Sequence, residues 1–196
     1  MKKRTAFIGA LMSFLPLGQP LVIGTGAVFT STALMISVPE KVKAETVQFY
    51  IDRGDEKYNN GNEGDYYGAI FDYTKAIEIA PNNLDASYAY SRRGSAKFDL
   101  KDFDGAILDQ TKSIEIRPDA FNLAFRADAK YELGDHYGAI SDYNKAIKLD
   151  SQASYPVLMR GVAKEAIGDM KGACSDWRKA SSLDNEDAAK WVKEDC

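Results

Sequence analysis

Histidine and cysteine are almost absent from this chain. Among its 196 residues there is one histidine, His136, and there are two cysteines, Cys174 and Cys196. A zinc site needs several His or Cys ligands at regular spacing, and a Ser-His-Asp set needs a histidine beside its nucleophile. His136 lies in a turn without such companions, and no phosphate-binding glycine loop follows a strand pattern. We therefore expect no metal, no cofactor and no catalytic residues.

An excess of basic charge is also missing. The first 44 residues carry five basic and one acidic side chain, so the remainder has 20 basic and 28 acidic side chains, a net charge of −8. Nucleic acid and anionic lipid both attract proteins through a basic face. The charge balance therefore argues against nucleic acid and against lipid headgroups as partners.

Charged side chains are lacking altogether between residues 5 and 39. Lys2, Lys3 and Arg4 precede this stretch, and Val42-Lys43-Ala44 offers a signal-peptidase site before Glu45. Residues 1–44 then form a cleaved signal peptide, although residues 21–38 are also long enough for a short membrane span. In the second case the chain stays anchored through residues 5–38. Either interpretation predicts export to the periplasm or the thylakoid lumen.

An internal repeat dominates the rest of the chain. Four similar segments begin at residues 64, 101, 134 and 168, with spacings of 37, 33 and 34 residues. Each begins with Gly-Asp, except that Lys101 replaces glycine, and a helical apolar pattern follows. Glycine permits a left-handed turn and aspartate caps the following helix. A period near 34 residues predicts helix-turn-helix units that stack into a solenoid.

Small residues recur at two places in every unit. The eighth position holds Gly54, Gly94, Ala127 and Gly161, and the twentieth holds Ala69, Ala106, Ala139 and Ala173. These positions resemble the tetratricopeptide repeat, in which small side chains let paired helices approach closely. The chain is similar to exported repeat proteins of the cyanobacterial type.

The resemblance implies an all-α solenoid, preceded by the hydrophobic export segment. A repeat domain over residues 45–196 would contain four helix-turn-helix repeats, at about 47–83, 84–120, 121–153 and 154–187. Residues 186–196 show an apolar stripe that includes Ala188 and Trp191, and they are predicted to form a capping helix.

Two charged positions are constant in all four units. They are occupied by Arg53, Arg93, Arg126 and Arg160 on the first helices, and by Asp72, Asp109, Asp142 and Asp176 on the second helices. A basic ladder that grips an acidic peptide is one interpretation. We favour structural ion pairs between the two helices, because equal numbers of both charges recur at fixed offsets.

The two cysteines lie near the C-terminus. Cys174 is early in the last repeat's second helix, and Cys196 ends the capping helix. With a turn near residues 183–185, antiparallel packing of the two helices places both cysteines at a similar level along the helix axes. We predict a disulfide over free thiols, conditional on export, and such a bridge stabilises by about 3 kcal/mol.

The family resemblance implies that a partner binds on the concave side, which the first helices form. Carried over by position, that face includes Tyr58, Tyr88, Ser95, Phe98, Phe121, Asp128, Tyr131 and Tyr155. The Lys and Asn of the family's carboxylate clamp are missing, because the fifth and ninth positions hold Ile51, Ser91, Ala124, Leu158 and Asp55, Ser95, Asp128, Val162.

These features predict a non-catalytic protein-interaction scaffold that binds a peptide or helix with apolar and basic side chains. Two alternatives stay open. One is an accessory domain or an unrecognised hydrolase of the cell envelope, which would need a deep pocket with convergent carboxylates. The other is a self-associating structural spacer.

Overall fold

The computed structural model describes residues 39–196, and every regular element in this range is an α-helix. The helices are α1 (Glu40–Asn60), α2 (Glu63–Ile79), α3 (Leu84–Asp99), α4 (Phe103–Ile116), α5 (Ala120–Glu132), α6 (His136–Leu149), α7 (Ser154–Ala166), α8 (Met170–Ser181) and α9 (Glu186–Asp195). None of these helices is long and apolar enough to cross a membrane. The predicted export segment, residues 5–38, lies outside the described residues.

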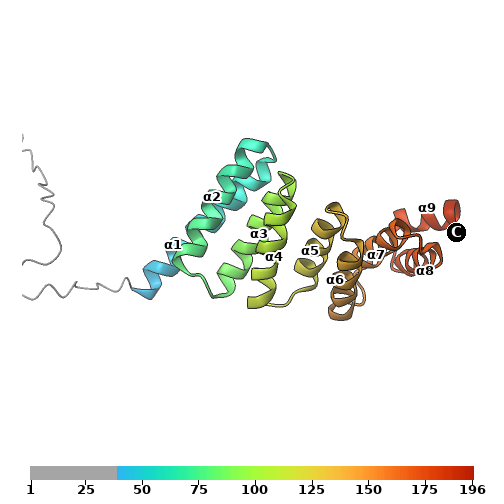
Figure 1. Cartoon of the computed structure of the whole chain (residues 1–196). Helices are drawn as coiled ribbons and strands as arrows, with labels where there is room; N and C mark the ends of the chain where they lie inside the picture. The colour runs from blue at the N-terminus through green and yellow to red at the C-terminus, as the bar shows by residue number, and fades with distance from the viewer. Residues whose placement is uncertain (1–38) are drawn as a thin grey trace, which may run out of the picture. The chain divides into compact units, whose positions relative to one another are not determined.

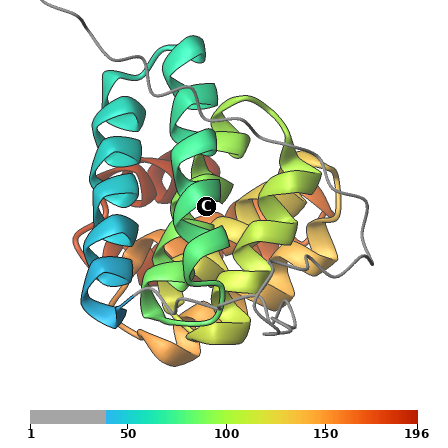
Figure 2. The same ribbon diagram turned by 90° about the vertical axis from the view of Figure 1, so that its left-hand side faces the viewer.

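The helices are arranged as successive antiparallel pairs, α1/α2, α3/α4, α5/α6 and α7/α8, followed by α9. The pairs follow one another in a row (Figure 1), and the view along that row shows them turning relative to each other (Figure 2). Each second helix contacts the next first helix, and the first helices also contact one another. The first helices therefore line the inner side of the stack. The predicted all-α solenoid of four pairs and a cap is confirmed for the described residues.

The turn inside each later pair follows from its predicted sequence. Lys101, Gly134 and Gly168 all have a positive φ, of 62°, 81° and 83°. The aspartate that follows caps the next helix, and in the third pair Asp135 Oδ1 accepts a hydrogen bond from the Gly138 amide at 2.9 Å. Glycine adopts this left-handed backbone at little cost. At Lys101 the same conformation is sterically unfavourable, because the residue has a β-carbon.

Small residues bring the two helices of a pair together. Ala69, Ala106, Ala139 and Ala173 are fully buried. Opposite them, a β-carbon added to Gly54 would lie 2.7 Å from the Tyr73 ring, and one added to Gly161 would lie 2.4 Å from Trp177 Nε1. The glycines are therefore required by the close approach of large aromatic rings, which fill the space that the small residues leave.

The interior is mainly apolar around the first, third and fourth pairs and polar at the contact between the second and third pairs. Apolar clusters form around Tyr73, Tyr143 and Trp177. Between the second and third pairs, by contrast, Ser91 Oγ donates to Asn122 Oδ1 at 2.6 Å and Asn122 Nδ2 donates to Ser113 Oγ at 2.8 Å. All three of these side chains are buried, so this contact depends on directional hydrogen bonds.

The C-terminal helix closes the stack against α8. Trp191 of α9 meets Trp177 edge-on, with ring centroids 5.5 Å apart. A disulfide joins Cys174 to Cys196 across 22 residues of chain. At the other end, α1 begins at Glu40, inside the predicted 1–44 leader, so cleavage after Ala44 would remove only the first turn of this helix.

Gly161→Ala is expected to destabilise the protein by about 1–3 kcal/mol, because the added methyl group overlaps the Trp177 indole. Gly64 is the matched control: it is also helical, but a β-carbon there meets nothing closer than 3.7 Å. Gly64→Ala is expected to be neutral or slightly stabilising. Thermal unfolding of both variants measures the difference, and equal melting temperatures would contradict this account of the packing.

Candidate functional site

The four arginines and four aspartates of the repeated pattern meet in every pair. In the third pair, Arg126 Nε and Nη2 donate to the two oxygens of Asp142 at 2.7 and 2.8 Å. Arg53 and Asp72, Arg93 and Asp109, and Arg160 and Asp176 form the same fork. A lysine one turn after each arginine joins the carboxylate, as Lys130 does at 2.7 Å. The aspartates are buried, so each pair of helices is joined by a desolvated ion pair.

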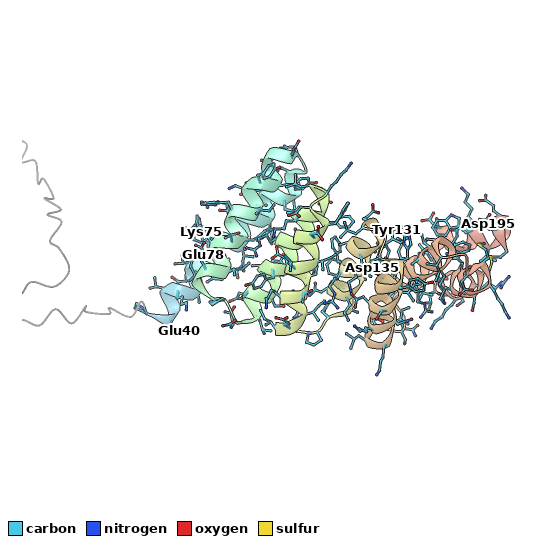
Figure 3. The ribbon with its side chains drawn as sticks, viewed as in Figure 1. Glu40, Lys75, Glu78, Tyr131, Asp135 and Asp195 are labelled. Carbon is cyan, nitrogen blue, oxygen red and sulfur yellow. A yellow bond between two sulfur atoms is a disulfide. The ribbon has the colours of Figure 1, made fainter. Side chains whose placement is uncertain are left out.

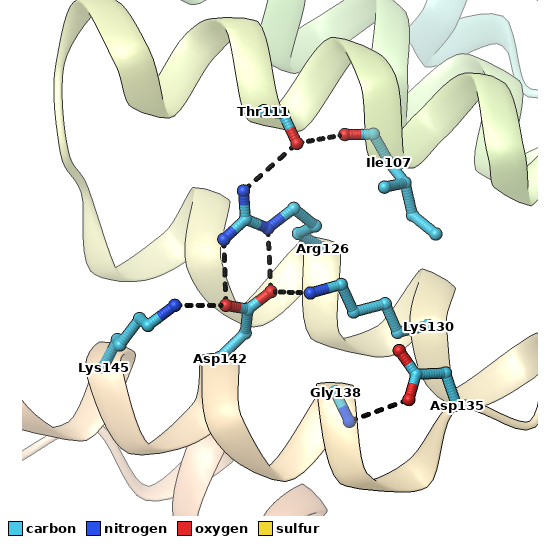
Figure 4. Close-up of polar contacts among 8 residues, drawn as sticks. All are labelled: Ile107, Thr111, Arg126, Lys130, Asp135, Gly138, Asp142 and Lys145. Carbon is cyan, nitrogen blue, oxygen red and sulfur yellow. Dashed lines mark hydrogen bonds and ion pairs between the residues drawn. The ribbon is translucent and has the colours of Figure 1, made fainter.

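The third donor of the arginine reaches the preceding pair. Figure 4 shows Arg126 Nη1 donating to Thr111 Oγ1 of α4, at 3.1 Å. Arg93 bonds Thr74 in the same way, and Arg160 bonds Asn144. These acceptors were missed in the sequence, although each stands two residues after the aspartate of its own unit. The fork therefore holds three helices, from two successive pairs, at one point.

Electrostatics keeps the carboxylates of Asp72 and Asp142 charged. Burial acts to raise the pKa of Asp142, but hydrogen bonds from Arg126 and Lys130 outweigh it and leave the pKa lower than usual. The same competition lowers the pKa of Asp72 beside Arg53 and Lys57. The arginines are thus engaged within the chain, and the geometry makes them connectors between helices.

A second carboxylate network lies on the inner side, between the first two pairs. Asp55 of α1 accepts hydrogen bonds from Tyr73 at 2.6 Å and from Tyr88 at 2.7 Å. Arg92 Nε lies 3.0 Å from the same carboxylate, and the guanidinium carbon is 4.3 Å from the centre of the Tyr58 ring. Burial and the bond to Asp55 raise the pKa of Tyr88 to about 12, so the hydroxyl stays a donor. A cleft of about 240 Å³ opens beside this network, lined by Gln48, Ile51, Asp55, Asp85 and Tyr88.

The same arrangement recurs between the third and fourth pairs. Asp128 of α5 accepts hydrogen bonds from Tyr143 at 2.5 Å and from Tyr155 at 2.8 Å. Burial raises the pKa of Asp128 more than the two hydroxyl bonds lower it. Asp128 and Tyr155 were on the inner face in the sequence-based prediction, but Tyr143 was not, and the pairing across repeats was not foreseen.

Aromatic rings replace these polar groups in the middle of the inner side. Phe98 packs against Phe125 with centroids 5.5 Å apart, and Phe125 packs against Phe121 at 5.3 Å. Ser95 and Gln110 stand here where the neighbouring networks have aspartate and tyrosine. The inner side therefore has a carboxylate network near each end and a section without a carboxylate, rich in phenylalanine, between them.

The predicted partner-binding residues divide into three groups by exposure. Tyr88, Phe121 and Tyr155 are 41%, 58% and 48% exposed. Tyr58, Phe98 and Tyr131 are half-buried. Ser95 and Asp128 are buried, with 2% and 8% exposure, so they lie behind the surface and support the side chains around them. Within residues 39–196 no group of His, Cys, Asp and Glu side chains is arranged to hold a metal ion.

Comparison with protein families identifies the repeat. The tetratricopeptide repeat model matches residues 58–83, 87–120 and 123–152. Residues 58–152 therefore contain repeats of the tetratricopeptide type. The fourth pair lies outside the matched ranges, yet it has the same helix pairing and the same Arg160–Asp176 fork as the three matched tetratricopeptide repeats.

Solved structures share this arrangement of tetratricopeptide repeats, whereas no curated protein matches the chain in sequence. MamA superposes with a TM-score of 0.65 at 24% identity, over 72% of this chain and 74% of MamA. The OM64 tetratricopeptide domain of Arabidopsis has a TM-score of 0.55 at 30% identity, over 57% of this chain and 95% of that domain. The first such domain of Spaghetti (RPAP3), bound to an HSP90 peptide, has a TM-score of 0.53 at 24% identity, over 55% and 88%.

Arg126→Ala is expected to reduce the free energy of unfolding by about 3–5 kcal/mol, because the buried Asp142 loses its fork and Thr111 loses its donor. Lys112→Ala is the control, since Lys112 and Glu115 form an exposed pair with side chains 58% and 56% accessible. That change is expected to leave the stability nearly unchanged, because solvent screens the exposed pair. Chemical denaturation measures both, and an unchanged stability of the Arg126 variant would show that the ladder serves something other than structure.

Proposed function

We propose that this protein is a non-catalytic scaffold that binds a polypeptide segment along its inner face. One observation carries the proposal: three large aromatic side chains stand exposed at the same position of three successive first helices. Tyr88, Phe121 and Tyr155 each lie six residues before the small residue of their own helix. The inner face thus presents one exposed aromatic group in each of the last three repeats, whereas the first repeat has Gln48 at this position.

Exposed aromatic groups in register favour protein binding over other functions. Large apolar side chains that recur together on a solvent-exposed surface often mark a site of protein interaction. Aromatic residues contribute much of the binding energy of protein interfaces. Their rings also lose little conformational freedom on binding, because few bonds rotate. A segment that spans the inner face would meet each ring in turn.

Charge on the inner face favours a partner with basic side chains. Asp52, Asp85, Glu132 and Glu165 lie on the first helices, and the net charge of residues 45–196 is −8. The cation nearest to the first network, Arg92, is already paired with Asp55. An extended or helical segment with alternating apolar and basic residues therefore complements this surface.

The peptide in the Spaghetti structure has a different chemistry. The HSP90 peptide there, SRMEEVD, ends in acidic residues. The present chain has Asp55 and Asp128 at two of the positions where the family's carboxylate clamp has its cationic and amide groups. Repulsion between like charges opposes an acidic tail at these sites, so we do not propose one as the ligand.

We also propose that the scaffold works on the extracytoplasmic side. Supporting this are the basic residues 2–4, the uncharged stretch 5–39 and the cysteine pair, since disulfides persist mainly in oxidising compartments.

Phe121→Ala is expected to weaken partner binding at least about tenfold, because a large exposed ring on the inner face is lost. Leu108→Ala is the matched control: Leu108 is 68% exposed but lies on α4, a second helix. Partners captured by the unaltered chain are identified by mass spectrometry, and each variant's affinity for them is then measured. Equal weakening by both changes, or by neither, would contradict binding on the inner face.

The mass of the native protein tests export. We expect a chain that begins at Glu45 and is lighter by the two hydrogen atoms that disulfide formation removes. Full-length mass with the disulfide would favour an uncleaved anchor instead. Full-length mass with two free thiols would contradict export.

A further inference from the structure

The chain contains two copies of one inner-face network, and the second copy lacks a member. In the first copy, Asp55, Tyr58, Tyr73, Tyr88 and Arg92 come together. The equivalent positions of the second copy hold Asp128, Tyr131, Tyr143, Tyr155 and Met159. The carboxylate and all three tyrosines are retained, whereas the cation is replaced by methionine.

Nothing else in the described part of the chain supplies that cation. The nearest lysine on the same helix, Lys130, is 2.7 Å from Asp142 and belongs to the ion-pair ladder. The carboxylate of Asp128 receives only the neutral hydroxyls of Tyr143 and Tyr155. Its charge is therefore nearly buried and has no counter-ion, an arrangement that is unfavourable unless a cation completes it.

The middle of the inner side shows that the fold does not require this carboxylate. At the equivalent positions Ser95 and Gln110 stand in place of the aspartate and the buried tyrosine, and Phe125 stands in place of Arg92. In this middle section the cation and the carboxylate are both absent. The aspartate between the third and fourth pairs is thus the exception within this chain.

We propose that Asp128 receives the guanidinium group of an arginine that belongs to the bound partner. This inference rests on the proposed binding of a polypeptide to the inner face, and it names one side chain of that polypeptide. The arginine would take the place that Arg92 has in the first network: bonded to the carboxylate and flat against a tyrosine. Each oxygen of Asp128 has a lone pair left for this bond, since each accepts only one hydroxyl.

The surroundings of Asp128 suit such a guest. Tyr155 is 48% exposed at the edge of the site, and Tyr131 stands at the C-terminal end of α5 (Figure 3). Tyr131 corresponds to Tyr58, over which Arg92 stacks, and its ring centroid lies 5.0 Å from that of His136. Glu132 adds a second negative charge nearby. Met159 is unbranched and partly buried, so its flexible side chain can move aside as a guest enters.

The test uses the full chain and a short acetylated, amidated peptide of alternating leucine and arginine. Matched peptides carry citrulline, a neutral isostere of arginine, or lysine in its place. We expect the unaltered chain to bind the arginine peptide at least tenfold more tightly than the citrulline peptide, by calorimetry or fluorescence anisotropy. Free L-arginine is added as a competitor, to distinguish a peptide-borne guanidinium from the free amino acid.

Two variants decide whether Asp128 is responsible. Met159→Arg restores the missing cation inside the chain, and Asp128→Asn removes the charge; both should abolish the preference for arginine over citrulline. Asp55→Asn is the control and should keep the preference, because Arg92 already occupies that network. Circular dichroism establishes that each variant is folded, and the Asn variant keeps the test decisive if Met159→Arg does not fold.

Several outcomes would overturn the inference. These are absence of peptide binding, equal binding of the arginine and citrulline peptides, and a preference that survives Asp128→Asn. Equally tight binding of the lysine peptide, or complete displacement by free L-arginine at equal concentration, would also overturn it. The proposed function is judged separately: if Phe121→Ala still weakens partner binding while arginine shows no preference, the scaffold stands and only the arginine site is wrong.

Discussion

The buried fork between arginine and aspartate is the interaction on which the rest of this structure depends. It joins the two helices of every pair, and its third donor ties a pair to the one before it. It also removes cations from the surface, because four arginines and four lysines are committed to the four aspartates. The free charge left on the first helices is then mostly acidic, so the element that stabilises the stack also sets the electrostatic character of its inner face.

Much of the fold was readable from the sequence because its signals are local. The Gly-Asp turns, the small residues and the spacing near 34 residues all act within one unit, and they predicted four helix pairs over about residues 47–187. The first helix begins earlier than predicted, at Glu40. The inner-face networks were not readable in the same way. Asp55 bonds Tyr88 across 33 residues, and Asp128 bonds Tyr155 across 27, so each contact depends on how successive units turn. Sequence position alone placed Ser95 and Asp128 on the face, whereas packing buries both.

The contacts between successive pairs are chemically unequal, although the repeat is regular. A carboxylate with two tyrosines joins the first pair to the second and the third to the fourth, and a serine–asparagine network joins the second to the third. Hydrogen bonds between buried groups have strict geometry, so each junction fixes its own angle. The aromatic positions are consequently held in a defined register, and the segment proposed to bind there would have to match it in its own spacing.

The first repeat differs from the later repeats at the position that packs against a preceding pair. The third position of the later repeats is buried against the preceding pair and holds Ala89, Asn122 and Pro156. In the first repeat it holds Phe49, which is 56% exposed and lies 5.1 Å from the guanidinium carbon of Arg53. An exposed aromatic ring therefore stands at this end of the stack, whereas at the other end α9 packs on α8 and is joined to it by the disulfide. The two ends thus differ in chemistry from the junctions between repeats, and the surface proposed to bind a partner is the first-helix side, where Tyr88, Phe121 and Tyr155 recur in register.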